Sequence, residues 1–161
     1  QGASWQRCQT HFMRNILDVT PSSCRDEVKA RARAILDSPD METARSLLAK
    51  TIDTFEKKAP RAMKILETGF EDALAVLALP EKYRKRLRTT NGLERLNEEI
   101  RRRERVIRIF PNRESALRLI GAVLLEIDNK WAEGRRYLDM TDYLEWRKQQ
   151  AHNVTAIRQV S

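Results

Sequence analysis

The sequence predicts a mostly helical protein, in which one short segment near the N-terminus is the candidate for a β-strand. Five Gly, five Pro and three Tyr in 161 residues leave few sites for hairpin turns. Apolar residues recur three and four positions apart along most of the chain, which is the spacing of a helix face. Proline and capping residues divide this pattern into segments of ordinary helix length.

The N-terminal part of the chain contains the candidate strand, at residues 3–8, and two expected helices. The helical pattern begins at His11. Ser22 or Ser23 can cap a second helix, which continues to about Leu36. The expected buried positions of these two helices are Phe12, Ile16, Leu17, Val28, Ala32 and Ile35.

A third helix is expected from residue 41 to about residue 58, with Asp40 as its N-cap. Pro60 suits the first turn of a fourth helix, which ends at Leu79 and Pro80. The fourth helix is apolar on more than one side, so we expect it to lie at the centre of the fold. Its apolar residues are Met63, Ile65, Leu66, Phe70, Leu74, Val76 and Leu77; those of the third helix are Ala44, Leu47, Leu48 and Ile52.

Asn91 is the expected N-cap of a strongly charged helix, which stops at the Phe-Pro-Asn sequence of residues 110–112. A more apolar helix follows, from about residue 113 to residue 128, and the aromatic tail is also assigned as helix. The charged helix has a narrow apolar stripe of Leu93, Leu96, Ile100 and Ile107. The expected buried side of the next helix is Leu117, Ile120, Val123, Leu124 and Ile127, and the tail contains Trp131, Tyr137, Tyr143 and Trp146.

Composition limits the class of protein. With 41% hydrophobic and 34% charged residues, the chain is expected to form a globular domain. The longest apolar run, at 119–125, is too short to cross a bilayer, and no signal-peptide pattern is present. We therefore expect a cytoplasmic, nucleoid-associated protein with no membrane partner. Cys8 and Cys24 give no disulfide framework and are expected to be free thiols.

Positive charge is concentrated in residues 82–108, about a sixth of the chain. This segment contains eleven Lys or Arg and four Glu, which gives it +7 of the formal net charge of +8. Such a concentration is typical of a surface that binds nucleic acid. Few aromatic residues accompany it, which favours contact with duplex phosphates over base stacking. The residues expected to contact nucleic acid are Arg88, Asn91, Arg95, Arg101, Arg102, Arg103 and Arg105.

The same charges also have a plain interpretation as a solvated helix face. Glu98 and Arg102, and likewise Glu99 and Arg103, are four residues apart and could form ion pairs on that face. Such pairs do not account for a surplus of seven positive charges. Contact with phosphates is therefore the better explanation.

Two interpretations of Glu94 remain open. In the first, Asn91 caps a helix and Glu94, three residues later, accepts a hydrogen bond from its backbone N–H in a capping box. In the second, the carboxylate lies among arginines because it holds a divalent metal ion beside a phosphodiester. One Glu cannot form a two-metal site, and Glu98, on the same helix face, cannot complete it.

Cys8 and His11 form a Cys-x-x-His pair, which is half of a typical zinc site. Cys24 and His152 lie at unsuitable spacing to complete that site. A buried thiol and an imidazole at a helix start fit the periodicity better. No Ser-His-Asp arrangement, phosphate-binding loop or HExxH motif is present, which argues against hydrolases, kinases and zincins.

Two segments carry a family resemblance. One is SWQRCQTHFMRN at 4–15, and the other is RTTNGLERLN at 88–97, which continues through RRR at 101–103 to IFPN at 109–112. Further matches at 117–122 and 137–140 extend the likeness over nearly the whole chain. In their order and length these motifs resemble those of the bacterial Mutator-type transposases, the IS256 family.

The resemblance implies a DDE-type recombinase on an RNase H-like fold, which cuts and joins DNA at element ends with the help of Mg²⁺. Its Cys-x-x-His signature maps onto Cys8 and His11, just after a core strand. The catalytic Glu, which is also a metal ligand, maps onto Glu94, with Glu98 as the alternative if the alignment is shifted.

The resemblance also implies an organisation as one partial domain, 1–161. Residues 1–11 would end a core strand, residues 12–80 would form a helical insertion, and residues 81–161 would contain the Glu-bearing basic helix and the C-terminal helices. In the family both catalytic aspartates precede the Cys-x-x-His signature, whereas Asp18 and Asp26 follow it here.

We therefore expect the C-terminal portion of a transposase, which takes part in DNA transposition but has no nuclease or strand-transfer activity of its own. The alternative is a helical DNA-binding or regulatory protein derived from a truncated transposase. A plain helical protein with a solvated basic face would bind duplex DNA only weakly. In a fragment we also expect an exposed apolar patch around Trp5, Phe12, Leu93 and Leu96, which would favour a homo-oligomer.

Overall fold

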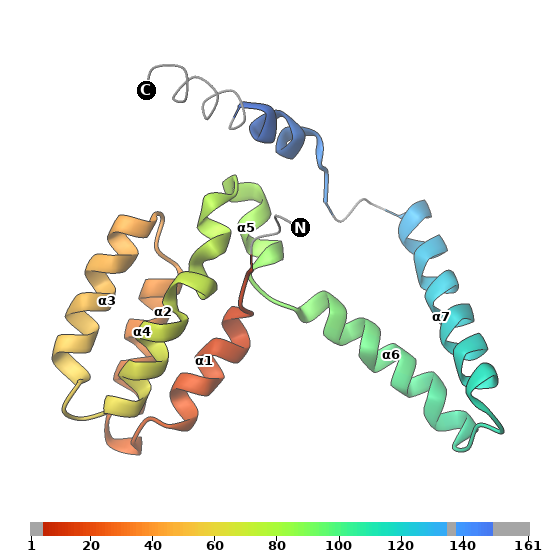
Figure 1. Cartoon of the computed structure of the whole chain (residues 1–161), viewed down its shortest axis with the longest axis horizontal. Helices are drawn as coiled ribbons and strands as arrows, with labels where there is room; N and C mark the ends of the chain where they lie inside the picture. Colours follow the sequence, from red (N-terminus) through yellow and green to blue (C-terminus); the bar gives the residue numbers. More distant parts are fainter. Residues whose placement is uncertain (1–4, 135–137, 150–161) are drawn as a thin grey trace. The chain divides into compact units, whose positions relative to one another are not determined.

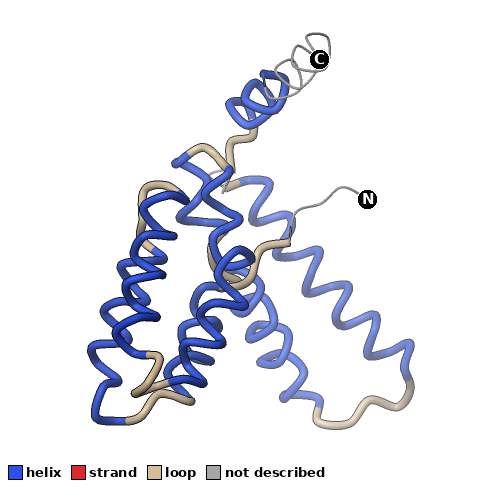
Figure 2. Tube along the Cα trace, turned by 60° about the vertical axis from the view of Figure 1, so that its left-hand side comes forward, coloured by secondary structure: helices blue, strands red, loops and turns tan. Residues whose placement is uncertain are grey.

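The computed structural model describes residues 5–134 and 138–149, and the chain divides into two compact units, Gln1–Thr90 and Asn91–Ser161. Among the described residues every regular element is a helix (Figure 2), which confirms the expected mostly helical fold. The strand expected at residues 3–8 is wrong for its described part, because residues 5–8 belong to no regular element. Residues 3 and 4 lie outside the described residues.

The first unit is built around a bundle of the helices α1 to α4, which lie side by side (Figure 1). The short helix α5 follows the bundle and leads to the end of the unit. In chain order the elements are α1 (Gln9–Asp18), η1 (Ser22–Cys24), α2 (Arg25–Leu36), α3 (Met41–Phe55), α4 (Pro60–Leu74), η2 (Ala75–Ala78) and α5 (Glu81–Leu87).

Helix starts in the first unit follow the sequence signals in one case and depart from them in another. Asp40 caps α3, since its carboxylate accepts a hydrogen bond from the Thr43 backbone N–H at 2.7 Å. The cap expected from Ser22 or Ser23 is wrong. Both serines lie in the 3-10 turn η1, and α2 begins after Cys24 without a side-chain cap. The tighter turn provides the backbone partners that a capping side chain would have supplied.

The core of the first unit is centred on α4, as its many-sided apolar pattern predicts. Seven residues of α4 are buried, and side chains of α1, α2 and α3 pack around them. The ring of Phe12 is fully buried in this core, so its expected place in an exposed patch is wrong. The largest fully buried side chains of this unit are Phe12, Ile16, Val28, Ile35, Thr51, Phe55, Leu66 and Leu74.

The segment before α1 is attached to the C-terminal end of α4, and among the described residues no strand pairs with it. The Arg7 backbone N–H donates to a main-chain carbonyl in the last turn of α4 at 2.9 Å. The side-chain amides of Gln6 and Gln9 both donate to the Ala73 carbonyl, at 3.0 Å and 2.9 Å. These bonds occupy carbonyls that a helix end leaves without partners. They also fix the position of the intervening Cys8.

The second unit contains two long helices, α6 (Asn91–Ile107) and α7 (Arg113–Glu133), and a helical stretch at 141–149. Between α6 and α7 the backbone turns at Arg108, which has a φ of 60°. Asn112 then caps α7 by accepting a hydrogen bond from the Ser115 backbone N–H at 2.8 Å. Helix α7 extends five residues beyond the expected end at 128.

The second unit buries little of its apolar surface. Among its described residues Val123 is the one in the buried class. Leu117 and Leu124, which the sequence places on the buried side of α7, are 55% and 39% exposed, so that expectation is wrong for these two. No helix in the described part of the chain is both long enough and apolar enough to span a membrane.

Candidate active site

Cys8 occupies the N-cap position of α1, with an extended backbone (φ −60°, ψ 116°). Its carbonyl accepts a hydrogen bond from the Phe12 N–H at 2.9 Å, in the first turn of the helix. The next residue, Gln9, donates its N–H to the Arg88 carbonyl at 2.9 Å. This bond places the residues that follow α5 beside the start of α1.

The thiol of Cys8 accepts a hydrogen bond from Thr90, the last residue of the first unit. The Thr90 hydroxyl donates to the Cys8 Sγ at 3.4 Å. Burial raises the pKa of this thiol, but hydrogen bonds from the Thr90 hydroxyl, from the backbone N–H groups of His11 and Thr90 and from the His11 side chain together lower the pKa to about 6. A thiol with this pKa is largely thiolate at neutral pH, which is the form that binds metals and reacts as a nucleophile.

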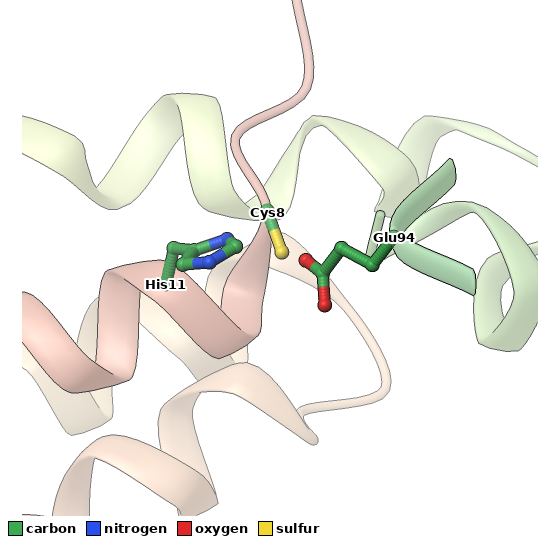
Figure 3. A group of neighbouring side chains, drawn as sticks. All are labelled: Cys8, His11 and Glu94. Carbon is green, nitrogen blue, oxygen red and sulfur yellow. The ribbon is translucent and has the colours of Figure 1, made fainter. Parts of the chain in front are cut away.

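Cys8, His11 and Glu94 form a small group of potential ligands. His11 stands in the first turn of α1, and Glu94 stands in the first turn of α6, four residues after Thr90. One ligand atom from each of the three side chains lies within 4.8 Å of the other two. Figure 3 shows the imidazole, the thiol and the carboxylate turned toward one another.

The start of α6 bears on the capping role considered for Glu94. Helix α6 begins at Asn91, which is therefore its first helical residue and not the N-cap that the sequence predicts. The third helical residue is then Leu93, so Glu94 lies one position too far along for a capping box. Its carboxylate is turned toward the Cys8 thiol in Figure 3.

These three ligands do not form a complete site for Mg²⁺. Magnesium prefers oxygen ligands in octahedral geometry, and this group offers a single carboxylate. Thiolate and imidazole ligands suit softer ions such as zinc. Glu94 could supply one of the oxygen ligands of a magnesium ion, but further carboxylates would be needed to hold it. The alternative candidate, Glu98, belongs to no such group among the described residues.

The residues expected to contact nucleic acid fall into two sets. Arg88 is in the first unit, where its guanidinium pairs with the Asp37 carboxylate at 2.8 Å. The others lie on α6, where Asn91, Arg95, Arg101, Arg102 and Arg105 are exposed and Arg103 is half-buried. Among the described residues Arg95, Arg101 and Arg105 have no ion-pair partner. The free cations of α6 are therefore available to phosphates.

Two of the α6 arginines pair with one glutamate. Glu99 accepts from Arg102 at 2.7 Å and from Arg103 at 3.0 Å, so the expected Glu99–Arg103 pair is confirmed and Arg102 pairs with Glu99 instead of Glu98. Hydrogen bonds from Arg102 and then from Arg103 lower the pKa of Glu99 to about 2. Arg103 also reaches Glu126 of α7 at 3.3 Å, which joins the two helices.

Thr90 is the residue of this site that the sequence patterns did not indicate. Its hydroxyl lowers the pKa of the Cys8 thiol although 82 positions separate the two residues in the chain. A Thr directly before an expected helix start is a common capping residue, and that signal could have drawn attention to it.

Comparison with known proteins gives a consistent result. A family model described as "Transposase, Mutator family" matches residues 1–134. The chain is 42% identical, over 91% of its length, to the transposase for insertion sequence element ISRM5 of Rhizobium meliloti, and 44% identical, over 84% of its length, to that for IS406 of Burkholderia multivorans. It is 40% identical to the transposase for IS256 in transposon Tn4001 of Staphylococcus aureus, over 84% of its length. The chain spans 37%, 35% and 35% of these three relatives.

Proposed function

Because this chain belongs to the Mutator family of transposases, we propose that it acts in DNA transposition as the C-terminal portion of a DDE-type transposase on an RNase H-like fold. In this role it supplies the catalytic Glu94 and cationic surfaces that hold the DNA at element ends. The observation that carries the proposal is the position of the Glu94 carboxylate, which lies beside Cys8 and His11 at the start of an arginine-rich helix.

The chain's own residues have two tasks in this proposal. Glu94 would place its carboxylate at the reacting phosphodiester, as one oxygen ligand of the active-site cation. The unpaired arginines of α6 neutralise neighbouring phosphates and keep the strand in place. When bound, Mg²⁺ would supply Lewis-acid activation of the scissile phosphate. The remaining carboxylates would come from polypeptide beyond this sequence, so the chain by itself is expected to be inactive.

A chimera tests this role of Glu94. The chain would replace the matching segment of the 42% identical Rhizobium transposase, and cleavage of its element ends would be measured with Mg²⁺. We expect activity in the chimera, no activity in the isolated chain, and loss of at least about a thousandfold on Glu94→Gln, as for other essential catalytic groups. Glu98→Gln is the matched control, and it should retain activity.

The opposite pattern would reject the assignment. If the chimera cleaves DNA equally well with Glu94→Gln but fails with Glu98→Gln, the catalytic residue is Glu98. If the isolated chain shows robust cleavage, the proposed dependence on further polypeptide is wrong.

The cationic surface also supports a second candidate function, a DNA-binding or regulatory protein derived from a transposase. That function needs the arginines of α6 but not the carboxylate of Glu94. It predicts that the isolated chain binds element ends and that Glu94→Gln leaves this binding unchanged or slightly stronger. A chimera that binds the ends without cleaving them would favour this candidate.

A further inference from the structure

A second cationic surface lies within the first unit, on and around α5. Lys82, Arg84, Lys85 and Arg88 line a groove of about 680 Å³, which we call the α5 groove. Its opposite wall is formed by the end of α2 and the loop that follows. Four apolar residues also line the groove, namely Leu36, Pro39, Val76 and Leu77.

Arg84 is held in a fixed position in this groove. Its Nε donates to the Leu79 carbonyl at 2.8 Å, and its Nη1 donates to the Pro39 carbonyl at 2.9 Å. Both acceptors are neutral main-chain oxygens, so they orient the guanidinium without neutralising its charge. A guanidinium that is already ordered loses little conformational entropy when it binds an anion. Arg84 is therefore well prepared to bind a phosphate.

Arg88 continues the cationic lining. Its ion pair with Asp37 is partly exposed, with side-chain exposures of 38% and 51%, and pairs of this kind contribute little stability. A phosphate could therefore replace the carboxylate at low cost. A smaller cavity of about 200 Å³ is also lined by this pair, together with Arg33.

The charge of the groove exceeds what helix stability requires. Cations near the end of a helix interact favourably with about half a negative charge there. The two adjoining cavities are lined by five Lys or Arg, and their carboxylates are Asp37 and Glu81. Lys82 and Lys85, three residues apart on α5, are both exposed. This excess of positive charge would attract an external polyanion.

We propose that the α5 groove binds the sugar–phosphate backbone of one strand of duplex DNA, with the phosphates on Lys82, Arg84 and Lys85 and the sugars against the apolar lining. The choice of DNA as the polyanion rests on the function proposed above. The groove differs from the arginine-rich surface of α6 because the groove is concave and contains an ordered guanidinium, that of Arg84. It adds Lys82, Arg84 and Lys85 to Arg88 as DNA contacts of the first unit.

The test is the salt dependence of duplex binding by the full chain. The slope of log K against log salt is negative, and each lost phosphate contact reduces its magnitude by about 0.9. We expect Lys82→Gln with Lys85→Gln to reduce the magnitude of the slope by about 1.8. The control is Lys57→Gln with Lys58→Gln, which removes the same charge from the exposed turn before α4, at the end of the bundle away from α5 (Figure 1). The control should leave the slope unchanged.

Two further variants separate this inference from the proposed function. Arg84→Lys keeps the charge but loses the planar group held by two carbonyls, so we expect at least a several-fold loss of affinity. Arg101→Gln with Arg105→Gln tests α6. If this α6 variant weakens binding while the groove variant matches its control, the α5 groove is rejected and the function stands. If the unaltered chain binds no duplex even at low salt, the DNA contacts of the proposed function fail, and the groove fails with them.

Discussion

The ring of Phe12 packs directly against the backbone of Gly69, so that a Cβ built on Gly69 would lie 2.5 Å from the Phe12 Cε2 atom. Here α1 and α4 approach more closely than any side chain at this position would allow. The Arg7 guanidinium lies over the same ring, 4.9 Å from its centroid, and its Nη1 would be 2.6 Å from that Cβ. The ring is also fully buried in the core, so it cannot move away freely.

Gly69→Ala should destabilise the first unit although alanine favours a helix. The helix preference is worth about 1 kcal/mol, whereas overpacking costs about 1–3 kcal/mol, and the confined ring places this site toward the upper part of that range. We expect a net loss of about 1–2 kcal/mol in urea unfolding. Gly121→Ala in α7 is the control, because a Cβ there meets nothing within 4 Å. A Gly69→Ala protein as stable as the parent would show that α1 and α4 are not packed as described.

Cys8 should react with iodoacetamide as a thiolate below neutral pH. Its pKa of about 6 predicts a reaction rate that rises through that pH and then levels off. Thr90→Val removes the hydroxyl that donates to the sulfur, so the midpoint should move to higher pH. The rates would be measured in a Cys24→Ala background with a chelator present. A midpoint that stays in place in Thr90→Val would exclude the hydroxyl as a cause of the low pKa.

The α6–α7 pair should loosen in acid because Arg103 bridges Glu99 and Glu126. The pKa values of both carboxyls are lowered from the ordinary 4.5, so both groups stabilise the fold fully at pH values above 4.5. This stabilisation is lost as the pH falls below 4.5, and for Glu99 the loss continues down to a pH of about 2. Far-UV circular dichroism should show helix loss in that window. Arg103→Gln should reduce the acid step, whereas Arg105→Gln, an exposed arginine of the same helix, should not. An equal acid step in both variants would contradict the bridge.

Self-association should follow from the exposed apolar surface of the second unit. Leu93 and Leu125 are each 62% exposed, and Trp131 is also 62% exposed. A cavity of about 420 Å³ on α7, lined in part by Leu125 and Trp131, gives this surface a concave region. We expect sedimentation velocity to show concentration-dependent oligomers, and Leu125→Gln with Trp131→Gln to shift them toward the monomer. A monomer at all concentrations would show that a second copy does not cover this surface.

Local sequence signals predicted α1 to α4 of the first unit, because helix-start residues and apolar periodicity agree there, but they did not predict α5. Asp40 and Pro60 mark helix starts, and the apolar sides of α4 correctly place it at the centre. The same signals failed where the outcome depends on tertiary partners. Leu117 and Leu124 satisfy a helical pattern, but whether they are buried depends on what lies beside α7. An extended segment such as residues 5–8 becomes a strand only if another strand pairs with it.

The candidate site could be predicted from the sequence only in part. Spacing alone left Glu94 between a capping box and a metal ligand, and the family resemblance favoured the second role. In the structure α6 begins at Asn91, so Glu94 is its fourth residue, one position beyond that of a capping box. The bond between Thr90 and Cys8 could not be predicted from spacing, because it depends on the return of the chain past the start of α1. Long-range contacts of this kind have no local pattern.

Gln6 and Gln9 should show strong coupling, because both donate to the Ala73 carbonyl. When either glutamine alone is changed to alanine, the Ala73 oxygen keeps one hydrogen-bond donor. The double change removes both donors at a partly buried site. The cost of an unsatisfied buried acceptor is about 1–3 kcal/mol, so the double variant should lose about that much more stability than the sum of the single variants.

Urea unfolding of the four proteins in this cycle gives the coupling free energy. Gln9→Ala with Thr54→Val is the control pair, since the Thr54 hydroxyl bonds only within α3 among the described residues and shares no partner with Gln9. The control changes should add to within about 0.5 kcal/mol. Additive effects of the Gln6 and Gln9 changes would mean that the Ala73 carbonyl is not their shared acceptor. The attachment of the Cys8 segment would then have to depend on the Arg7 main-chain bond to α4 and on the bond between Gln6 and Val76 of η2.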